Sequence, residues 1–141
     1  MFTHDVELSL QAATTLVNTL PDASHSGEDE LTTMAELDAW FTGEGFTGEL
    51  RRSPAELAAI RAVRPRLRGL WEAETDDAAV ALVNAMLVEG GALPRLVEHD
   101  GFGWHIHATT QDAPLADRVM VEVAMAWVDV LRQDERARLK R

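Results

Sequence analysis

The stretch PLADRVMVEVAMAWVDVLRQDE, residues 114–135, decides the fold class. Between Val119 and Leu131 it is apolar almost all the way round, which is typical of a central, buried helix. Such a helix needs partners on every side, and we expect the rest of the chain to supply them. Arg118 and Glu122 lie four residues apart and are expected to form an ion pair on the surface of this helix.

A β-hairpin is predicted just before this helix, at about residues 93–109. Its two strands flank Asp100-Gly101, a pair favoured in two-residue type I′ turns. That turn would place Val97 opposite Trp104, and the pairing decides which side chains share a face. The face expected to meet the core holds Leu93, Val97, Phe102, Trp104 and Ile106, and the opposite face holds Pro94, Leu96, Glu98, His105 and His107.

Four more helices are predicted towards the amino terminus, from apolar residues that recur at helical spacing. Thr33 with Glu36 forms a capping box, and Ser53 before Pro54 is a strong helix start. The expected helices cover residues 4–20, 33–43, 53–71 and about 77–88. The sequence therefore predicts an α+β fold with mainly helical content, in which about five helices pack around one antiparallel hairpin.

The charge of the chain argues against contact with nucleic acid. The net charge is −11, and four of the 13 basic residues lie in the last six positions. Residues 1–135 therefore carry 24 acids against 9 bases, a charge of −15. DNA binding needs cations that displace condensed counterions, so we do not expect this part to bind DNA. The basic residues 136–141 predict a continuation into a basic segment.

The composition also bounds the cell compartment and the chemistry. Cysteine is absent, which excludes disulfides and thiolate zinc sites in this chain. Residues 1–5 lack the features of a signal peptide, and no segment approaches the roughly 20 apolar residues of a membrane span. No nucleophile with its base, phosphate loop or dinucleotide fingerprint is recognisable. We therefore expect a cytoplasmic protein, without a membrane partner, that is not an enzyme.

His105 and His107 are the first candidates for a binding site. They lie two residues apart on a predicted strand and so project from one face. Such a pair can bind zinc, copper or nickel if Glu98 or His99 adds a third ligand. Alternatively, the two histidines line a ligand pocket, or they lie on a strand face that is exposed to solvent. Two ligands fall short of the usual three or four, so a ligand pocket is favoured over a metal site.

Trp104, Asn18 and Asn84 are the remaining candidates for ligand binding. Trp104 adjoins His105 in sequence and is able to form a pocket wall. The two asparagines each follow a valine near a predicted helix end, where asparagine either satisfies backbone groups or orients a ligand. The third predicted helix carries three arginines on one side, Arg61, Arg64 and Arg68. We expect them to form ion pairs at the surface rather than a binding site for an anion.

Several segments that together span nearly the whole chain carry a family resemblance. They are HDVELSL (4–10), LVNT (16–19), LTTMAELDAWF (31–41), LVNAML (82–87), PRLVEHDGFGWHIH (94–107) and AMAWVDVLRQDERARLK (124–140). The most specific are the hairpin and a final helix that ends in RxDExxRL. These segments resemble the ABATE domain, the amino-terminal part of the CGNR zinc-finger proteins.

The resemblance implies a bacterial, stress-induced transcription regulator. Residues 1–135 would then be its ligand- or stress-sensing domain, with an unknown small-molecule ligand and a homodimer as expected partners. The family's zinc finger, which has a Cys-Gly-Asn-Arg motif, would read DNA. We expect residues 136–141 to begin the linker to that finger, because its cysteines are absent here, and we expect zinc only there and no cofactor in this chain. The alternatives are a small metal-dependent or histidine-based enzyme that uses His105, His107 and a carboxylate, and a pure dimerisation module.

Overall fold

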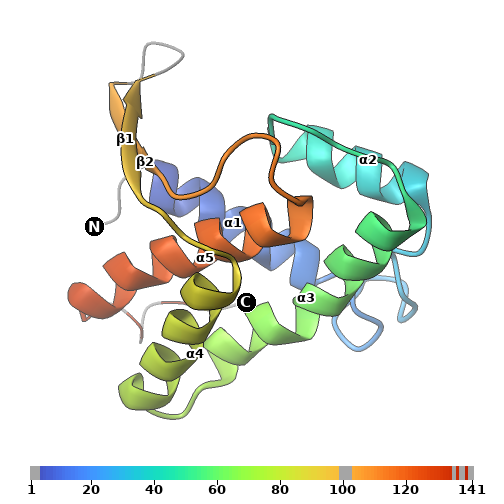
Figure 1. Cartoon of the computed structure of the whole chain (residues 1–141). Coiled ribbons are helices and arrows are strands. Elements are labelled where there is room, and N and C mark those ends of the chain that lie inside the picture. The colour runs from blue at the N-terminus through green and yellow to red at the C-terminus, as the bar shows by residue number, and fades with distance from the viewer. Residues whose placement is uncertain (1–3, 99–102, 135, 137–138, 140–141) are drawn as a thin grey trace.

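The computed structural model of the chain describes residues 4–98, 103–134, 136 and 139, and within them it contains five helices and one two-stranded sheet (Figure 1). The predicted mainly helical α+β fold is confirmed. The elements follow one another as α1 (His4–Val17), α2 (Met34–Gly43), α3 (Pro54–Glu72), α4 (Asp76–Glu89), β1 (Arg95–Glu98), β2 (Trp104–His107) and α5 (Leu115–Arg132).

Helix α5 lies at the centre of the fold, as its sequence predicts. It packs against α1, α3 and α4, and the hairpin projects from the end of the bundle nearest the start of α1 (Figure 1). Trp127 in α5 is fully buried, and its ring meets that of Trp71 edge-on at 5.2 Å between centroids. Burying an apolar side chain of this size stabilises the fold by about 1.5–3 kcal/mol or more.

The helix starts are fixed by local hydrogen bonds, which explains why the sequence predicts them well. The Thr33 hydroxyl accepts from the Glu36 N–H at 3.1 Å, and the Glu36 carboxylate accepts from the Thr33 N–H at 3.1 Å. The Ser53 hydroxyl caps α3 by accepting from the Glu56 N–H at 3.1 Å, and Pro54 lies in the first turn. These two caps satisfy backbone N–H groups that no helical carbonyl can reach.

Helix α3 continues through Pro65, which has no N–H to donate to the carbonyl of Arg61. The Nε of Arg64 donates to that carbonyl at 3.2 Å instead. Arg61 and Arg68 form ion pairs at the surface, as predicted, but Arg64 is only 3% exposed, so its prediction as a surface residue is wrong. Its buried guanidinium binds Asp29 in the loop after α1.

The hairpin forms where predicted, but its register differs by one residue. Val97 pairs with His105, not with Trp104, and Glu98 pairs with Trp104. Five residues therefore separate the strands instead of two, and Gly103 adopts a positive φ of 83° where the second strand begins. The predicted Asp100-Gly101 turn and Phe102 lie outside the described residues.

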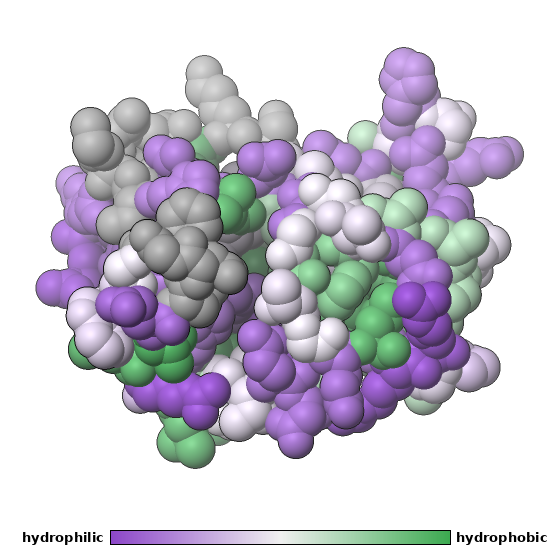
Figure 2. Space-filling model, turned by 90° about the horizontal axis from the view of Figure 1, so that it is seen from above, coloured by the Kyte–Doolittle hydropathy of each residue, from purple (hydrophilic) through white to green (hydrophobic). Residues whose placement is uncertain are grey.

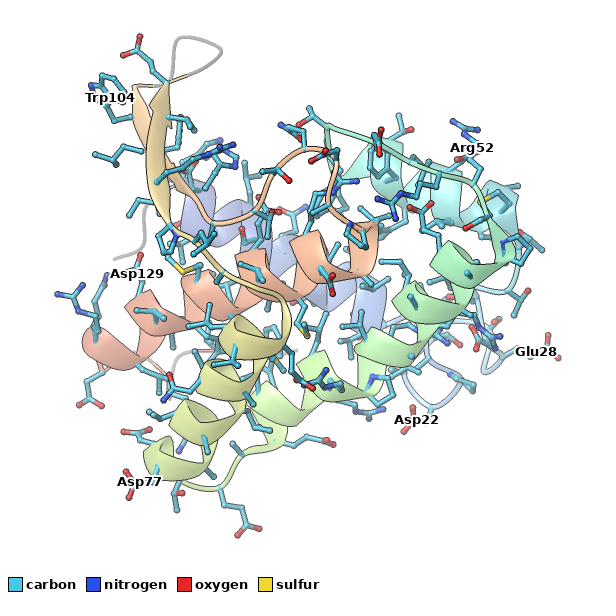
Figure 3. The ribbon with its side chains drawn as sticks, in the orientation of Figure 1. Asp22, Glu28, Arg52, Asp77, Trp104 and Asp129 are labelled. Atoms are coloured by element: carbon cyan, nitrogen blue, oxygen red, sulfur yellow. The ribbon has the colours of Figure 1, made fainter. Side chains whose placement is uncertain are left out.

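This shift of one residue moves the side chains of the second strand to the opposite face of the hairpin from the one predicted. Trp104 and Ile106, predicted to face the core, are 70% and 58% exposed. Leu93, also predicted for the core face, is 79% exposed. Figure 3 shows Trp104 pointing away from the helices. The intervening His105 contacts Asp5 in the first turn of α1.

Hydrophilic side chains cover much of the face shown in Figure 2, with apolar side chains visible between them. Within the part of the chain that the structure describes, no helix combines the length and the apolar character needed to cross a membrane.

Candidate functional site

The side of the hairpin that faces the helices is the candidate site. We call it the inner face, and it consists of Arg95, Val97, His105 and His107. Alternate residues of a strand share one side, so the pairs Arg95–His107 and Val97–His105 place all four together. The register observed here, and not the predicted one, combines the histidines with an arginine and an apolar side chain.

His105 connects the inner face to the first turn of α1. Its Nδ1 forms a hydrogen bond with the carboxylate of Asp5, which lies 100 residues away in sequence. The His105 side chain is only 11% exposed, and that of Asp5 is 48% exposed. The hairpin is therefore held to the bundle by a polar contact between the second strand and the first turn of α1.

Glu122 of α5 lies close to this contact and has an unusual titration. Burial raises the pKa of its carboxyl from 4.5 to about 7, Arg118 opposes that rise, and the negative charge of Asp5 adds to it. A carboxyl of this kind changes charge in the physiological pH range. The contact between His105 and Asp5 is thus influenced by a carboxyl group, that of Glu122, whose pKa lies near neutral pH.

We expect Glu122→Gln to stabilise the protein by about 2 kcal/mol at pH 8 and to have little effect at pH 5. The folded state binds the Glu122 proton more tightly than the unfolded state, so stability is lost as pH rises from 4.5 to about 7. Urea denaturation at both pH values measures the difference. Glu74→Gln, at an exposed position, is the matched control. No gain at pH 8, or an equal gain at both pH values, would show that the charge of Glu122 does not destabilise the folded protein.

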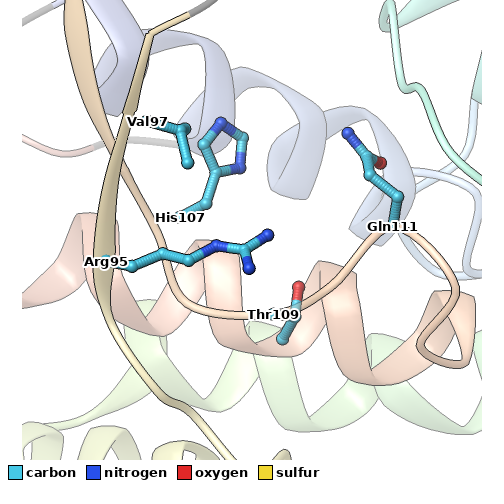
Figure 4. Close-up of a pocket in the computed structure, with 5 residues that line it drawn as sticks. All are labelled: Arg95, Val97, His107, Thr109 and Gln111. Carbon is cyan, nitrogen blue, oxygen red and sulfur yellow. The ribbon is translucent and has the colours of Figure 1, made fainter.

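A pocket of about 210 Å³ opens beside the inner face (Figure 4). Arg95, Val97 and His107 of the inner face form one part of its lining, and Thr109 and Gln111 of the loop before α5 form the other. The side chains of Arg95 and Gln111 extend towards the same space from opposite sides (Figure 4). The site therefore joins the hairpin to the segment that leads into the central helix.

Arg118 holds the Gln111 side of the pocket in place. It was predicted to pair with Glu122 on the surface, which is wrong, because Arg118 is only 5% exposed. Its guanidinium donates to the carbonyls of Ala113, at 3.0 Å, and Thr47, at 2.6 Å, and also to that of Glu49. These bonds connect the loop after α2 to the loop before α5.

Gly48 sits at the tightest point of this connection. It adopts a positive φ of 86°, and a Cβ there would lie 2.7 Å from the Gln111 carbonyl oxygen. A side chain at this position would therefore be strained and would also push the two loops apart. The carboxamide of Gln111 is fixed as well, since its Nε2 donates to the hydroxyl of Thr47 at 3.2 Å.

The structure keeps the two histidines together and places the other three residues predicted to bind a ligand elsewhere. His107 lines the pocket, and His105 lies next to it on the inner face. Trp104 lies on the opposite, outer side of the hairpin. Asn18 follows the last residue of α1, and Asn84 is an exposed residue in the middle of α4, not near a helix end.

Sequence reasoning missed several residues that the site contains. The pattern does not predict Arg95, Thr109 and Gln111 as residues that line a pocket. It also does not predict that Asp5 and Glu122 lie near each other. Arg95 would have been found from the correct register, because it lies opposite His107. Within residues 4–98 and 103–134, no three His, Asp or Glu side chains gather closely enough to hold a metal ion.

Residues 10–134 match the sequence model of a family described as "ABATE: Putative stress-induced transcription regulator". The chain belongs to the ABATE family. The match covers the candidate site except for Asp5, which lies before its first residue. No curated protein matches the sequence. The ABATE match thus agrees with the resemblance seen in the hairpin and final helix, and it associates this fold with transcription regulation under stress.

Proposed function

We propose that this chain is the signal-sensing part of a stress-induced transcription regulator and that the inner face of the hairpin receives the signal. The family supports the regulatory role. The observation that carries the sensing role is the pocket, which is lined jointly by the hairpin and by the loop leading into α5. A ligand in that position contacts two segments at once and can favour one arrangement of them over another.

Helix α5 is suited to transmit such a change. It starts only a few residues after Gln111 and packs against α1, α3 and α4 along its length. A tightly packed helix moves between discrete arrangements and does not deform gradually. A shift at the pocket end of α5 would therefore reach its other end, at Arg132, which leads to the basic residues 136–141.

We place DNA recognition beyond residue 141, in a CGNR-type zinc finger that would also hold the zinc of the regulator. The charge of −15 on residues 1–135 supports a DNA-binding part that is separate from these residues, because such a charge repels DNA. We further propose that the regulator is bacterial and cytoplasmic, that its ligand is a small molecule, and that this chain has no cofactor and no catalytic role.

The chain alone is expected not to shift duplex DNA in a gel at about 0.15 M salt, where contacts to phosphates are already weakened. The physical reason is that its acidic body repels the DNA backbone. The complete regulator, tested on the same duplex, is the positive control. Tight, salt-resistant binding by the chain alone would place the DNA-reading surface within residues 1–141 and would refute the assignment as a sensing part.

A second candidate function, dimerisation, is favoured by the opposite side of the hairpin. Leu96, Trp104 and Ile106 lie together there and are each more than half exposed, at 65%, 70% and 58%. Exposed apolar side chains that gather on one surface often mark an interaction site. Sensing and dimerisation use opposite faces of the hairpin, so one does not exclude the other.

A further inference from the structure

We propose that the pocket beside the inner face binds a small organic carboxylate, with Arg95 as the residue that holds the carboxylate group. This inference deepens the proposed function and rests on it, since it names the chemical class of the signal. It follows from the arginine, from the polar groups that share its pocket, and from the size of that pocket.

Arg95 differs from most arginines of this acidic chain. Ion pairs with Asp or Glu occupy Arg51, Arg52, Arg61, Arg64, Arg66, Arg68 and Arg136. Arg118 is saturated by backbone carbonyls. Among the described residues no carboxylate pairs with Arg95, and its guanidinium extends into the pocket (Figure 4). A guanidinium in this position can bind a carboxylate with two parallel hydrogen bonds.

The other lining residues suit the same ligand. The Thr109 hydroxyl and the Gln111 carboxamide can donate hydrogen bonds, and no Asp or Glu of the described residues lines the pocket. A second pocket of similar volume, between α3 and α5, is a useful contrast. Asp117 lines it, and the arginine in its lining, Arg66, is already paired with Glu89. As far as the described residues go, only the hairpin pocket of these two has an arginine without a paired or neighbouring acid in its lining.

The size and charge of the pocket narrow the ligand class. Its volume of about 210 Å³ is below the roughly 300–1,000 Å³ of drug-sized sites, so the ligand must be small. One guanidinium balances one negative charge, and the acidic body disfavours ligands of higher charge. Val97 and the methyl group of Thr109 offer apolar contact. A monocarboxylate with a short apolar body fits these features better than phosphate does.

Isothermal titration calorimetry on the purified chain tests this inference, with benzoate and butyrate as probes. We expect both to bind saturably and Arg95→Gln to weaken their binding by about tenfold or more, because it removes a charge-assisted hydrogen-bond pair. Arg132→Gln is the matched control. Arg132 also lacks an ion pair among the described residues but lines neither pocket, so affinity should stay within about twofold of the unmodified chain. Thr109→Val should weaken binding by a smaller factor.

Four results would overturn the inference. They are the absence of saturable binding for both carboxylates, equal binding of the neutral analogue benzamide, a preference for inorganic phosphate, and equal losses in the Arg95 and Arg132 variants. Circular dichroism confirms that each variant is folded. The two proposals can fail separately. If carboxylate binding depends on Arg95 but the complete regulator with Arg95→Gln has an unchanged stress response, this inference stands and the proposed function is refuted.

Discussion

Asp29→Ala is expected to lower the free energy of unfolding by about 3–5 kcal/mol. Its carboxylate receives two parallel hydrogen bonds from Arg64, at 2.8 and 2.9 Å, and Arg64 is only 3% exposed. Removing the carboxylate leaves a buried cation without its partner, which costs far more than breaking a surface pair. Asp29 also accepts from the Leu31 N–H at 2.9 Å, so the loop between α1 and α2 loses a second anchor.

Urea denaturation at pH 7 measures this loss, and Glu89→Ala is the matched control. Glu89 pairs with Arg66 where both side chains are about half exposed, so its removal should cost less than about 1 kcal/mol. Adding Arg64→Met to Asp29→Ala should recover part of the loss, because it removes the uncompensated charge. A loss below about 1 kcal/mol for Asp29→Ala would mean that solvent screens the pair.

The same pair makes a prediction about acid stability. The Arg64 guanidinium holds the pKa of Asp29 well below its ordinary value of 3.8. A depressed pKa in the folded state adds stability above the ordinary value, and this stability is lost as pH falls below it. The difference between the unmodified chain and Asp29→Ala should therefore be complete at pH 7 and shrink below about pH 4.

The parts of the fold that the sequence predicts are those fixed by neighbouring residues. The Thr33 capping box and the Ser53 cap need only residues three positions away. Helix α5 is recognisable because its own apolar residues lie on almost all of its sides. The hairpin register is different. It goes with Gly103, which adopts a left-handed conformation just before the second strand, and with the contact of His105 with Asp5. Neither is encoded in the Asp100-Gly101 turn signal.

The buried arginines show a second limit of sequence reasoning. Arg64 and Arg118 appear as helix-surface residues because a helical pattern locates only residues on the same helix. Their partners are a loop carboxylate and three loop carbonyls, which chain folding brings to them. The pocket residues Thr109 and Gln111 were missed for the same reason, since they lie in a loop whose position Arg118 and Gly48 determine.

His105→Ala combined with His107→Ala is expected to abolish the stress response of the complete regulator. His107 lines the pocket, and His105 holds the hairpin to α1 through Asp5. Without them a signal at the inner face would no longer favour one arrangement of the hairpin over another. Binding of DNA without stress should persist, because α5 and the body that carries it do not depend on these side chains for their core packing.

His25→Ala is the matched control, because His25 is exposed in the loop between α1 and α2, away from the hairpin in sequence. Melting curves of the two variants are the check that both remain folded. The most direct test of the account is the induction of a reporter gene by stress in cells that carry either variant of the complete regulator. The account predicts full induction with His25→Ala and none with the double variant. Full induction with the double variant would contradict it and would place the sensing site elsewhere in the protein.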